Sequence, residues 1–141
     1  MFIDASAIVA ILAREADRDV FVDQLIKCDT PFVVSPLVRI ESILALSRLR
    51  ASSTAERFFS ERSAEDCGQL YDKFTRGVGA EEMELSADIG RAAVGAYALF
   101  GKGTGHPAKL NLVDCFSYAC AKKLGTGLLY KGDDFAHTDL A

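Results

Sequence analysis

Met1-Phe2-Ile3-Asp4-Ala5-Ser6 is the stretch from which the rest of the fold can be argued. Phe2-Ile3 is typical of a short buried strand, and the apolar run 7–13 that follows is typical of a helix. Asp4 therefore stands where a strand ends and a helix begins. In open α/β sheets ligands bind outside the carboxyl ends of the strands, although an aspartate at this place can equally well cap the helix.

The composition of the chain limits its function class. Its 141 residues predict a single domain, 1–141, with a hydrophobic core of its own. The net charge of −4 and the pI of about 5.1 argue against a general nucleic-acid coat protein, but they allow an enzyme with an acidic site. The four cysteines form no C-x-x-C pair, which favours reduced thiols in a cytoplasmic protein. The apolar run 5–13 is too short to span a membrane, and no basic segment precedes it.

Segments typical of strands alternate with segments typical of helices along the chain. We expect strands at 2–3, 31–35, 81–85 and 128–130. We expect later helices from about 15, from 36 to about 49, from a Ser63 cap to about 74, from a Ser86 cap to 101 and from 111 to 125, with a break at 51–54. This order predicts an α/β fold in three layers, a central parallel β-sheet flanked by helices on both faces.

Four separate segments bring a carboxylate to the same edge of the predicted sheet. The four acids are Asp4, Glu41, Asp114 and Asp133. Each also has a purely structural explanation: Asp4 and Asp114 can be helix caps, Glu41 can pair with a neighbouring arginine, and Asp133 can be a turn residue. All four explanations holding at once is less probable than any one of them alone.

A cluster of four carboxylates has a chemical consequence. Two unit charges about 5 Å apart cost roughly 3 kcal/mol at an effective dielectric constant near 20. Either some of the acids are protonated or cations lie among them. Oxygen ligands without cysteine or histidine suit Mg²⁺ or Mn²⁺, which lower the pKa of bound water and clamp phosphoryl oxygens. The cluster therefore favours a metal-dependent hydrolase.

These residues resemble a known family. Over its whole length the chain is similar to PIN-domain ribonucleases, specifically to VapC-type toxins of bacterial toxin–antitoxin pairs. The resemblance rests on the blocks 2–6, 35–41, 106–111, 114–119 and 131–135. It implies a PIN-like fold, an RNA substrate, a cognate small antitoxin, a homodimer, and a Mg²⁺ or Mn²⁺ site on the same four acids. It also implies that the Ser6 hydroxyl helps to hold the acidic cluster.

The last block departs from the family pattern. Many members have a threonine two residues before the last acid, where this chain has Lys131. A supporting hydroxyl is then missing, or Lys131 contacts phosphate. Of the neighbours Asp133 and Asp134, we expect Asp133 to face the metal because it lies nearer the strand end, and Asp134 to cap the following turn. Lys109 and Arg39 are the candidates for RNA binding.

Three functions remain open at this point. The leading prediction is a metal-dependent endoribonuclease that acts as the toxin of a toxin–antitoxin pair. The first alternative is an α/β phosphohydrolase of another class, although the haloacid-dehalogenase type needs Asp-x-Asp where this chain has Asp4-Ala5-Ser6. The second alternative is a non-catalytic PIN-like binding module, against which the presence of all four acids argues.

Overall fold

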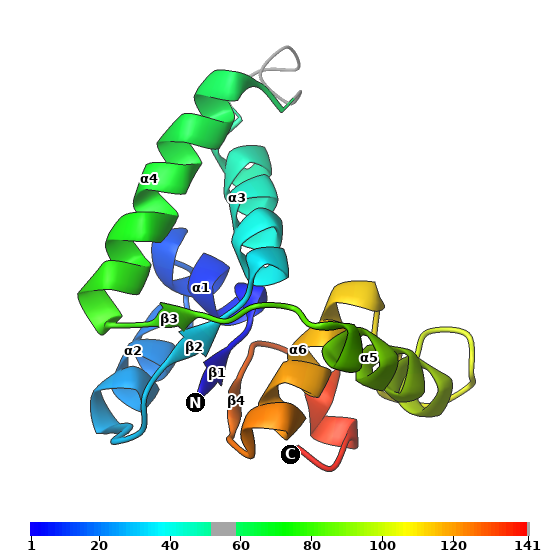
Figure 1. Cartoon of the computed structure of the whole chain (residues 1–141). Helices are drawn as coiled ribbons and strands as arrows, with labels where there is room; N and C mark the ends of the chain where they lie inside the picture. Colours follow the sequence, from blue (N-terminus) through cyan, green and yellow to red (C-terminus); the bar gives the residue numbers. More distant parts are fainter. Residues whose placement is uncertain (52–58, 141) are drawn as a thin grey trace.

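Four short parallel strands form the centre of the protein (Figure 1), seen in a computed structural model that describes residues 1–51 and 59–140. Their order across the sheet is β3-β2-β1-β4, and every neighbouring pair is parallel. The strands are β1 (Phe2–Ile3), β2 (Val33–Val34), β3 (Glu81–Glu82) and β4 (Leu128–Leu129). The predicted parallel sheet is confirmed, although β2, β3 and β4 are shorter than the predicted ranges 31–35, 81–85 and 128–130.

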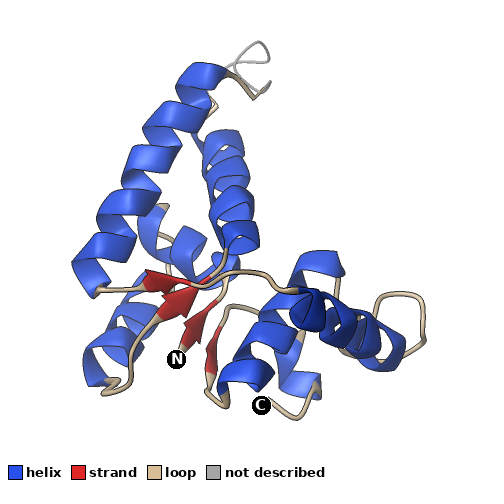
Figure 2. Ribbon diagram, viewed as in Figure 1, coloured by secondary structure: helices blue, strands red, loops and turns tan. Residues whose placement is uncertain are grey.

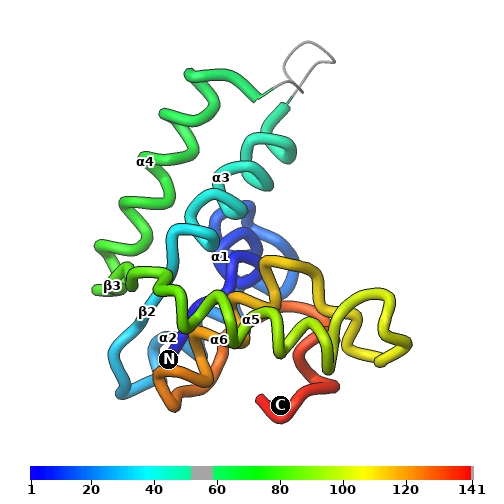
Figure 3. The backbone as a smooth tube through the Cα atoms, turned by 45° about the vertical axis from the view of Figure 1, so that its right-hand side comes forward, coloured from blue at the N-terminus to red at the C-terminus, as the bar shows by residue number. Residues whose placement is uncertain are grey.

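Helices occupy both sides of this sheet (Figure 2), which confirms the predicted three-layer α/β fold. Within the described ranges they are α1 (Ala5–Leu12), α2 (Arg18–Lys27), α3 (Pro36–Arg50), α4 (Glu61–Val78), α5 (Ala87–Phe100), α6 (Leu112–Leu124) and the 3₁₀ helix η1 (Phe135–His137). None of these helices combines the length and the apolar character that crossing a membrane requires. Helices α3 and α4 pack together and extend away from the sheet, and α5 packs on α6 (Figures 1 and 3).

The strand β1 lies in the middle of the sheet and fixes the position of Asp4. Phe2 and Ile3 are fully buried, and β1 pairs with β2 on one side and with β4 on the other. The backbone N–H of Asp4 donates to the carbonyl of Leu129 at 2.9 Å, which is the last hydrogen bond between this segment and β4. Asp4 is thus the first residue beyond the end of β1. Asp4 therefore lies at the carboxyl edge of the sheet, as the opening stretch of the sequence predicts.

Helix α4 differs from its predicted range at both ends. It begins at Glu61 because the hydroxyl of Ser60 accepts from the backbone N–H of Ser63 at 3.2 Å, so the predicted Ser63 cap is wrong. It continues to Val78, past Phe74, and stops where Gly79 takes a left-handed φ of 67°. The break predicted at 51–54 falls mostly outside the described residues.

Candidate functional site

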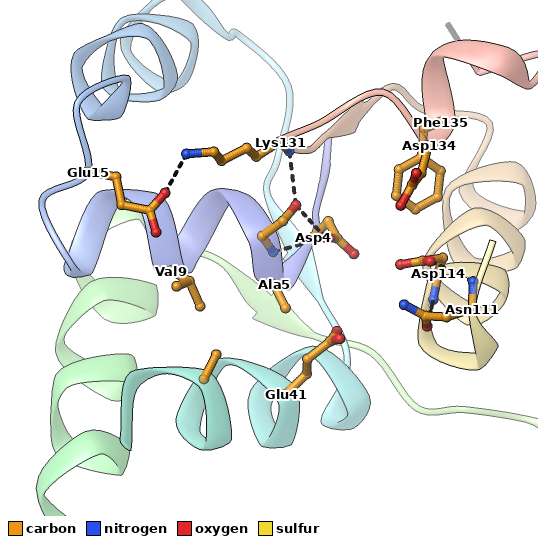
Figure 4. Close-up of a pocket in the computed structure, with 12 residues that line it drawn as sticks. Asp4, Ala5, Val9, Glu15, Glu41, Asn111, Asp114, Lys131, Asp134 and Phe135 are labelled. Atoms are coloured by element: carbon orange, nitrogen blue, oxygen red, sulfur yellow. Dashed lines mark hydrogen bonds and ion pairs between the residues drawn. The ribbon is translucent and has the colours of Figure 1, made fainter. Parts of the chain in front are cut away.

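A pocket of about 410 Å³ opens at the carboxyl edge of the sheet (Figure 4). Its walls come from the ends of β1 and β4, from α1, α3 and α6, and from the loop that follows β4. The residues that line it are Asp4, Ala5, Ser6, Val9, Glu15, Glu41, Ala45, Asn111, Asp114, Lys131, Asp134 and Phe135. Five of these side chains are carboxylates, so the pocket is strongly acidic.

Asp4 is the most firmly held of these acids. Its side chain is almost fully buried and caps α1, with Oδ1 accepting from the backbone N–H of Ser6 at 2.9 Å and from the Ser6 hydroxyl at 2.7 Å. Its second oxygen, Oδ2, accepts from the hydroxyl of Ser117 at 2.8 Å. The side chain of Asp4 therefore both caps α1 and lines the pocket.

Asp114 combines a cap with a position in the pocket in the same way. It is the third residue of α6, and its Oδ2 accepts from the backbone N–H of Asn111 at 2.7 Å in a reciprocal capping box. The pKa of Asp114 is raised to about 6, mainly by burial; the N–H of Asn111 lowers it, and the negative charges of Asp4 and Asp134 raise it. The carboxyl group of Asp114 therefore lies close to other acids.

Glu41 reaches the pocket from α3. The pKa of Glu41 is raised to about 7, mainly by burial and in addition by the charges of Asp4 and Asp114. Among the described residues Glu41 forms no ion pair, so pairing with a neighbouring arginine does not explain its place. Arg39 instead contacts Asp72 at 2.6 Å and Glu82 at 2.7 Å.

The acid on the loop after β4 that lines the pocket is Asp134, and Asp133 is outside the lining. Gly132 has a φ of 98°, which reverses the chain between the strand and η1. Asp134 occupies the position before η1, but its side chain makes no capping hydrogen bond there, so the expected cap is wrong. The labelled Asp134 side chain points toward the pocket in Figure 4, across from Asp114.

The lining of the pocket fits a hard divalent cation in its chemistry. Its ligands are carboxylate oxygens, without cysteine or histidine, which is the donor set of Mg²⁺ and Mn²⁺. Within residues 1–51 and 59–140, however, no three His, Cys, Asp or Glu side chains already stand in an arrangement that could hold an ion. The raised pKa values of Glu41 and Asp114 agree with the absence of such an arrangement, because carboxyl groups that are protonated do not need to surround a cation.

The two basic residues considered for RNA binding lie outside the pocket lining. Arg39 is engaged by Asp72 and Glu82, and its guanidinium lies 4.8 Å from the ring centroid of Tyr71. Lys109 is exposed and has a φ of 48°, an uncommon conformation for a residue other than glycine. Arg39 therefore joins α3 to α4 and β3, whereas Lys109 is free of such contacts in the described residues.

Ser117 is a site residue that the sequence reasoning did not identify. It lies three residues after Asp114 on α6, so the two side chains share one face of the helix. This spacing could have indicated that Ser117 lies near the pocket. Its contact with Asp4, 113 positions away in sequence, depends on the packing of α6 against β1, which the sequence does not reveal.

A Ser117→Ala variant should lower the free energy of unfolding by about 1–3 kcal/mol, because it leaves a buried oxygen of Asp4 without its donor. The matched control is Ser42→Ala on α3. Ser42 is equally buried, but its hydroxyl has no hydrogen-bond partner among the described residues, so its loss should cost less than about 0.5 kcal/mol. Urea unfolding measures both. Equal effects of the two substitutions would contradict the assigned role of Ser117.

The stability of the metal-free protein should fall as the pH rises from about 5 to 8. Glu41 and Asp114 bind protons more tightly when folded, with pKa values of about 7 and about 6 against ordinary values of 4.5 and 3.8. Their stabilising contribution is complete below the ordinary values and is lost as the pH rises through the raised ones, on the order of a few kcal/mol. Thermal unfolding in EDTA measures this, and Glu41→Gln should flatten the profile. A midpoint that rises from pH 5 to 8 would contradict it.

Comparisons with known proteins give a consistent result. A family model described as PIN domain matches residues 1–140. A VapC ribonuclease of Rhizobium meliloti (strain 1021) is 42% identical over 139 residues, which cover 99% of this chain and 98% of that protein. Ribonuclease VapC42 of Mycobacterium tuberculosis (strain H37Rv) is 34% identical, covering 99% of this chain and 96% of that protein.

A solved structure has the same fold. The crystal structure of Mycobacterium tuberculosis VapC20, described as a sarcin-ricin loop cleaving toxin, superposes with a TM-score of 0.71 over 99% of this chain and 95% of that one. The sequence identity between the two is 17%, so this likeness concerns the fold alone.

Proposed function

The chain belongs to the PIN-domain family as a VapC-type ribonuclease toxin, and from this premise we propose that it hydrolyses RNA phosphodiester bonds in the acidic pocket, with Mg²⁺ or Mn²⁺ bound there. One observation carries the assignment of the reaction to this pocket. The carboxyl groups of Glu41 and Asp114 have raised pKa values, partly because of the charge of Asp4, although the three acids come from separate elements. Such a concentration of negative charge is typical of a cation site.

The residues that would hold the cation are Asp4, Glu41, Asp114 and Asp134. A bound Mg²⁺ or Mn²⁺ supplies a water of lowered pKa and a positive charge that stabilises the phosphoryl oxygens. The sequence pattern favours Asp133 as the fourth acid, whereas the lining of the pocket favours Asp134, and we adopt Asp134 here.

The protein side chains prepare the pocket in two ways. Ser6 and Ser117 fix both oxygens of Asp4, so this carboxylate is oriented before any ligand arrives. Glu41 and Asp114, which hold protons more tightly than ordinary carboxyl groups, release them as a cation binds. Cation affinity should therefore increase between about pH 5 and 8.

Removal of divalent cations is the test of this function. Purified protein should cleave cellular RNA in the presence of Mg²⁺ or Mn²⁺, should stop when EDTA is in excess, and should recover when Mn²⁺ is restored. The rate of fragment formation measures the effect, and an Asp114→Asn preparation controls for contaminating nucleases. Undiminished cleavage in EDTA, or by the Asp114→Asn protein, would reject the mechanism.

The same assay addresses the two alternative functions. A phosphohydrolase of another class would release phosphate from small phosphomonoesters without cutting RNA. A non-catalytic binding module would retain RNA without cutting it. Asp4-Ala5-Ser6 lacks the second aspartate of the haloacid-dehalogenase type, which argues against the first of these.

The partners of the protein follow from the same family membership. We propose that RNA is the substrate, that a small antitoxin protein binds the chain, that the protein acts in the cytoplasm, and that two copies form a homodimer. The proposal that the chain binds an antitoxin and a second copy of itself is supported by large apolar side chains that are exposed on α2, α3 and α5. These side chains include Ile26, Ile40, Leu49, Val94 and Leu99.

A further inference from the structure

Lys131 is held by contacts of its backbone and of the ammonium group at the end of its side chain. Its backbone N–H donates to the hydroxyl of Ser6 at 2.9 Å. Its ammonium group pairs with Glu15 and lies 2.9 Å from the carboxylate of Asp17. The contacts join positions more than 110 residues apart in sequence, so none of them follows from local patterns.

These contacts place Lys131 alongside helix α1. Ser6 lies in the first turn of α1, whereas Glu15 and Asp17 follow its last residue, Leu12. Figure 4 shows the Lys131 side chain extended toward Glu15 above this helix. Lys131 and Glu15 also line the acidic pocket on the same side, so this contact belongs to the wall of the site.

The backbone of Lys131 is connected to Asp4 through Ser6. The Ser6 hydroxyl accepts from the N–H of Lys131 and donates to Oδ1 of Asp4 at 2.7 Å. A hydroxyl whose proton is already directed by one partner has a fixed orientation toward the other. The loop that begins at Lys131 also carries Asp134 into the pocket three residues later.

We propose that Lys131 is a positioning residue of the acidic pocket, whose ion pairs with Glu15 and Asp17 hold the loop 131–134 against α1 and thereby set Asp4 and Asp134. This inference rests on the proposed function of the pocket.

The surroundings of the ammonium group favour this role over direct phosphate contact. Two carboxylates face one ammonium, so the cation is already neutralised in the free protein. The hydrogen bond from Lys131 lowers the pKa of Asp17, and the same contact raises the pKa of Lys131. Exposed pairs of this kind contribute little to global stability, so the effect should be seen in the pocket and not in the folding of the chain.

The test compares Lys131→Met with the double variant Glu15→Gln, Asp17→Asn, and with all three changes together. The first readout is the exchange rate of the amide of residue 131, measured by NMR in metal-free protein. The second is the Mn²⁺ dissociation constant from calorimetry. Either variant should raise both roughly three- to tenfold, the scale of two exposed ion pairs. The triple variant should be no worse than either, because all of them break the same contact.

Two controls separate this role from a general change of surface charge. Lys131→Arg keeps a cation within reach of both carboxylates and should retain the exchange rate and the Mn²⁺ affinity. Lys122→Met removes a similar half-exposed ion pair, with Asp139 at 2.8 Å, outside the pocket lining, and should change neither readout. Thermal midpoints of all variants should agree within a few degrees.

Two results would overturn the proposal. One is unchanged amide exchange and unchanged Mn²⁺ affinity in Lys131→Met. The other is weaker RNA binding by Lys131→Met with unchanged or stronger RNA binding by Glu15→Gln, Asp17→Asn, which would make Lys131 a direct phosphate contact. If wild-type protein binds no Mn²⁺, the proposed function fails, whereas amide exchange in metal-free protein still decides the role of Lys131.

Discussion

An Asp4→Asn variant should cleave RNA at least about 100-fold more slowly than the wild type while it keeps its fold. Loss of groups that only support metal ligands commonly costs 10–100-fold, and loss of a ligand itself should reach the upper end of that range or exceed it. Asp4 is nearly fully buried at the carboxyl edge of the sheet, and its charge contributes to the raised pKa of both Glu41 and Asp114. Its removal therefore changes the electrostatics of the whole pocket.

Asparagine is a suitable replacement because it preserves the structural role of the side chain. It caps helices as well as aspartate does, and its carbonyl oxygen still accepts from Ser6. Its amide nitrogen can donate to the Ser117 hydroxyl, which accepts in place of donating. The stability of the metal-free variant should therefore stay near that of the wild type, and the pKa of Glu41 should fall toward its ordinary value.

The measurement is the single-turnover cleavage rate at saturating Mn²⁺, with Asp23→Asn as the matched control. Asp23 is an exposed acid on α2 that pairs with Lys27 at 3.9 Å and is not part of the pocket lining. In cells, expression without the antitoxin should arrest growth, and Asp4→Asn should relieve the arrest. Full cleavage activity of purified Asp4→Asn protein would show that Asp4 has no role in catalysis.

The sequence predicts Asp4, Glu41 and Asp114 in the pocket for local reasons. Asp4 directly follows a buried strand, and Asp114 lies in the first turn of α6 after Asn111, a strong N-cap. The sequence places Glu41 inward together with Leu37 and Leu44, one turn away on either side. The buried residues of α3 are instead Val38, Ser42, Leu46 and Ser47, and Glu41 lies three residues after Val38. For Asp4 and Asp114 the junction of a strand or loop with a helix determines the position of the side chain.

The contacts of Ser117 and Lys131 could not be predicted in this way. Each meets its partner across more than 110 positions, and only the packing of α6 and of the loop after β4 against α1 and β1 brings them together. The start of α4 was missed for a different reason. Ser60 and Ser63 are both residues that can cap a helix, and the sequence does not distinguish them. In the structure Ser60 is the cap, because its hydroxyl accepts from the backbone N–H of Ser63.

The choice between Asp133 and Asp134 as the cation ligand stays a prediction, but the lining of the pocket differs from the choice that the sequence favours. Alternation of side chains correctly implies that only one of two neighbours faces the pocket, but a loop has no fixed period from which to choose. Gly132, with its φ of 98°, turns the chain before the two acids, and Asp134 then has helical backbone angles of −59° and −49°. The nearer acid, Asp133, is thereby outside the lining and Asp134 is within it.

Asp134→Asn should accordingly weaken Mn²⁺ binding by roughly tenfold or more, whereas Asp133→Asn should leave it within about twofold. The charge of Asp134 raises the pKa of Asp114, so the two acids share the pocket, and the Asp134 side chain makes no capping bond that its loss would break. Both acids are exposed, so neither variant should unfold the protein. Calorimetric Mn²⁺ titration of the two variants compares them under identical conditions. Loss of affinity in Asp133→Asn alone would mean that the loop rearranges when the cation binds, because Gly132 would then have to turn the chain so that the nearer acid enters the pocket.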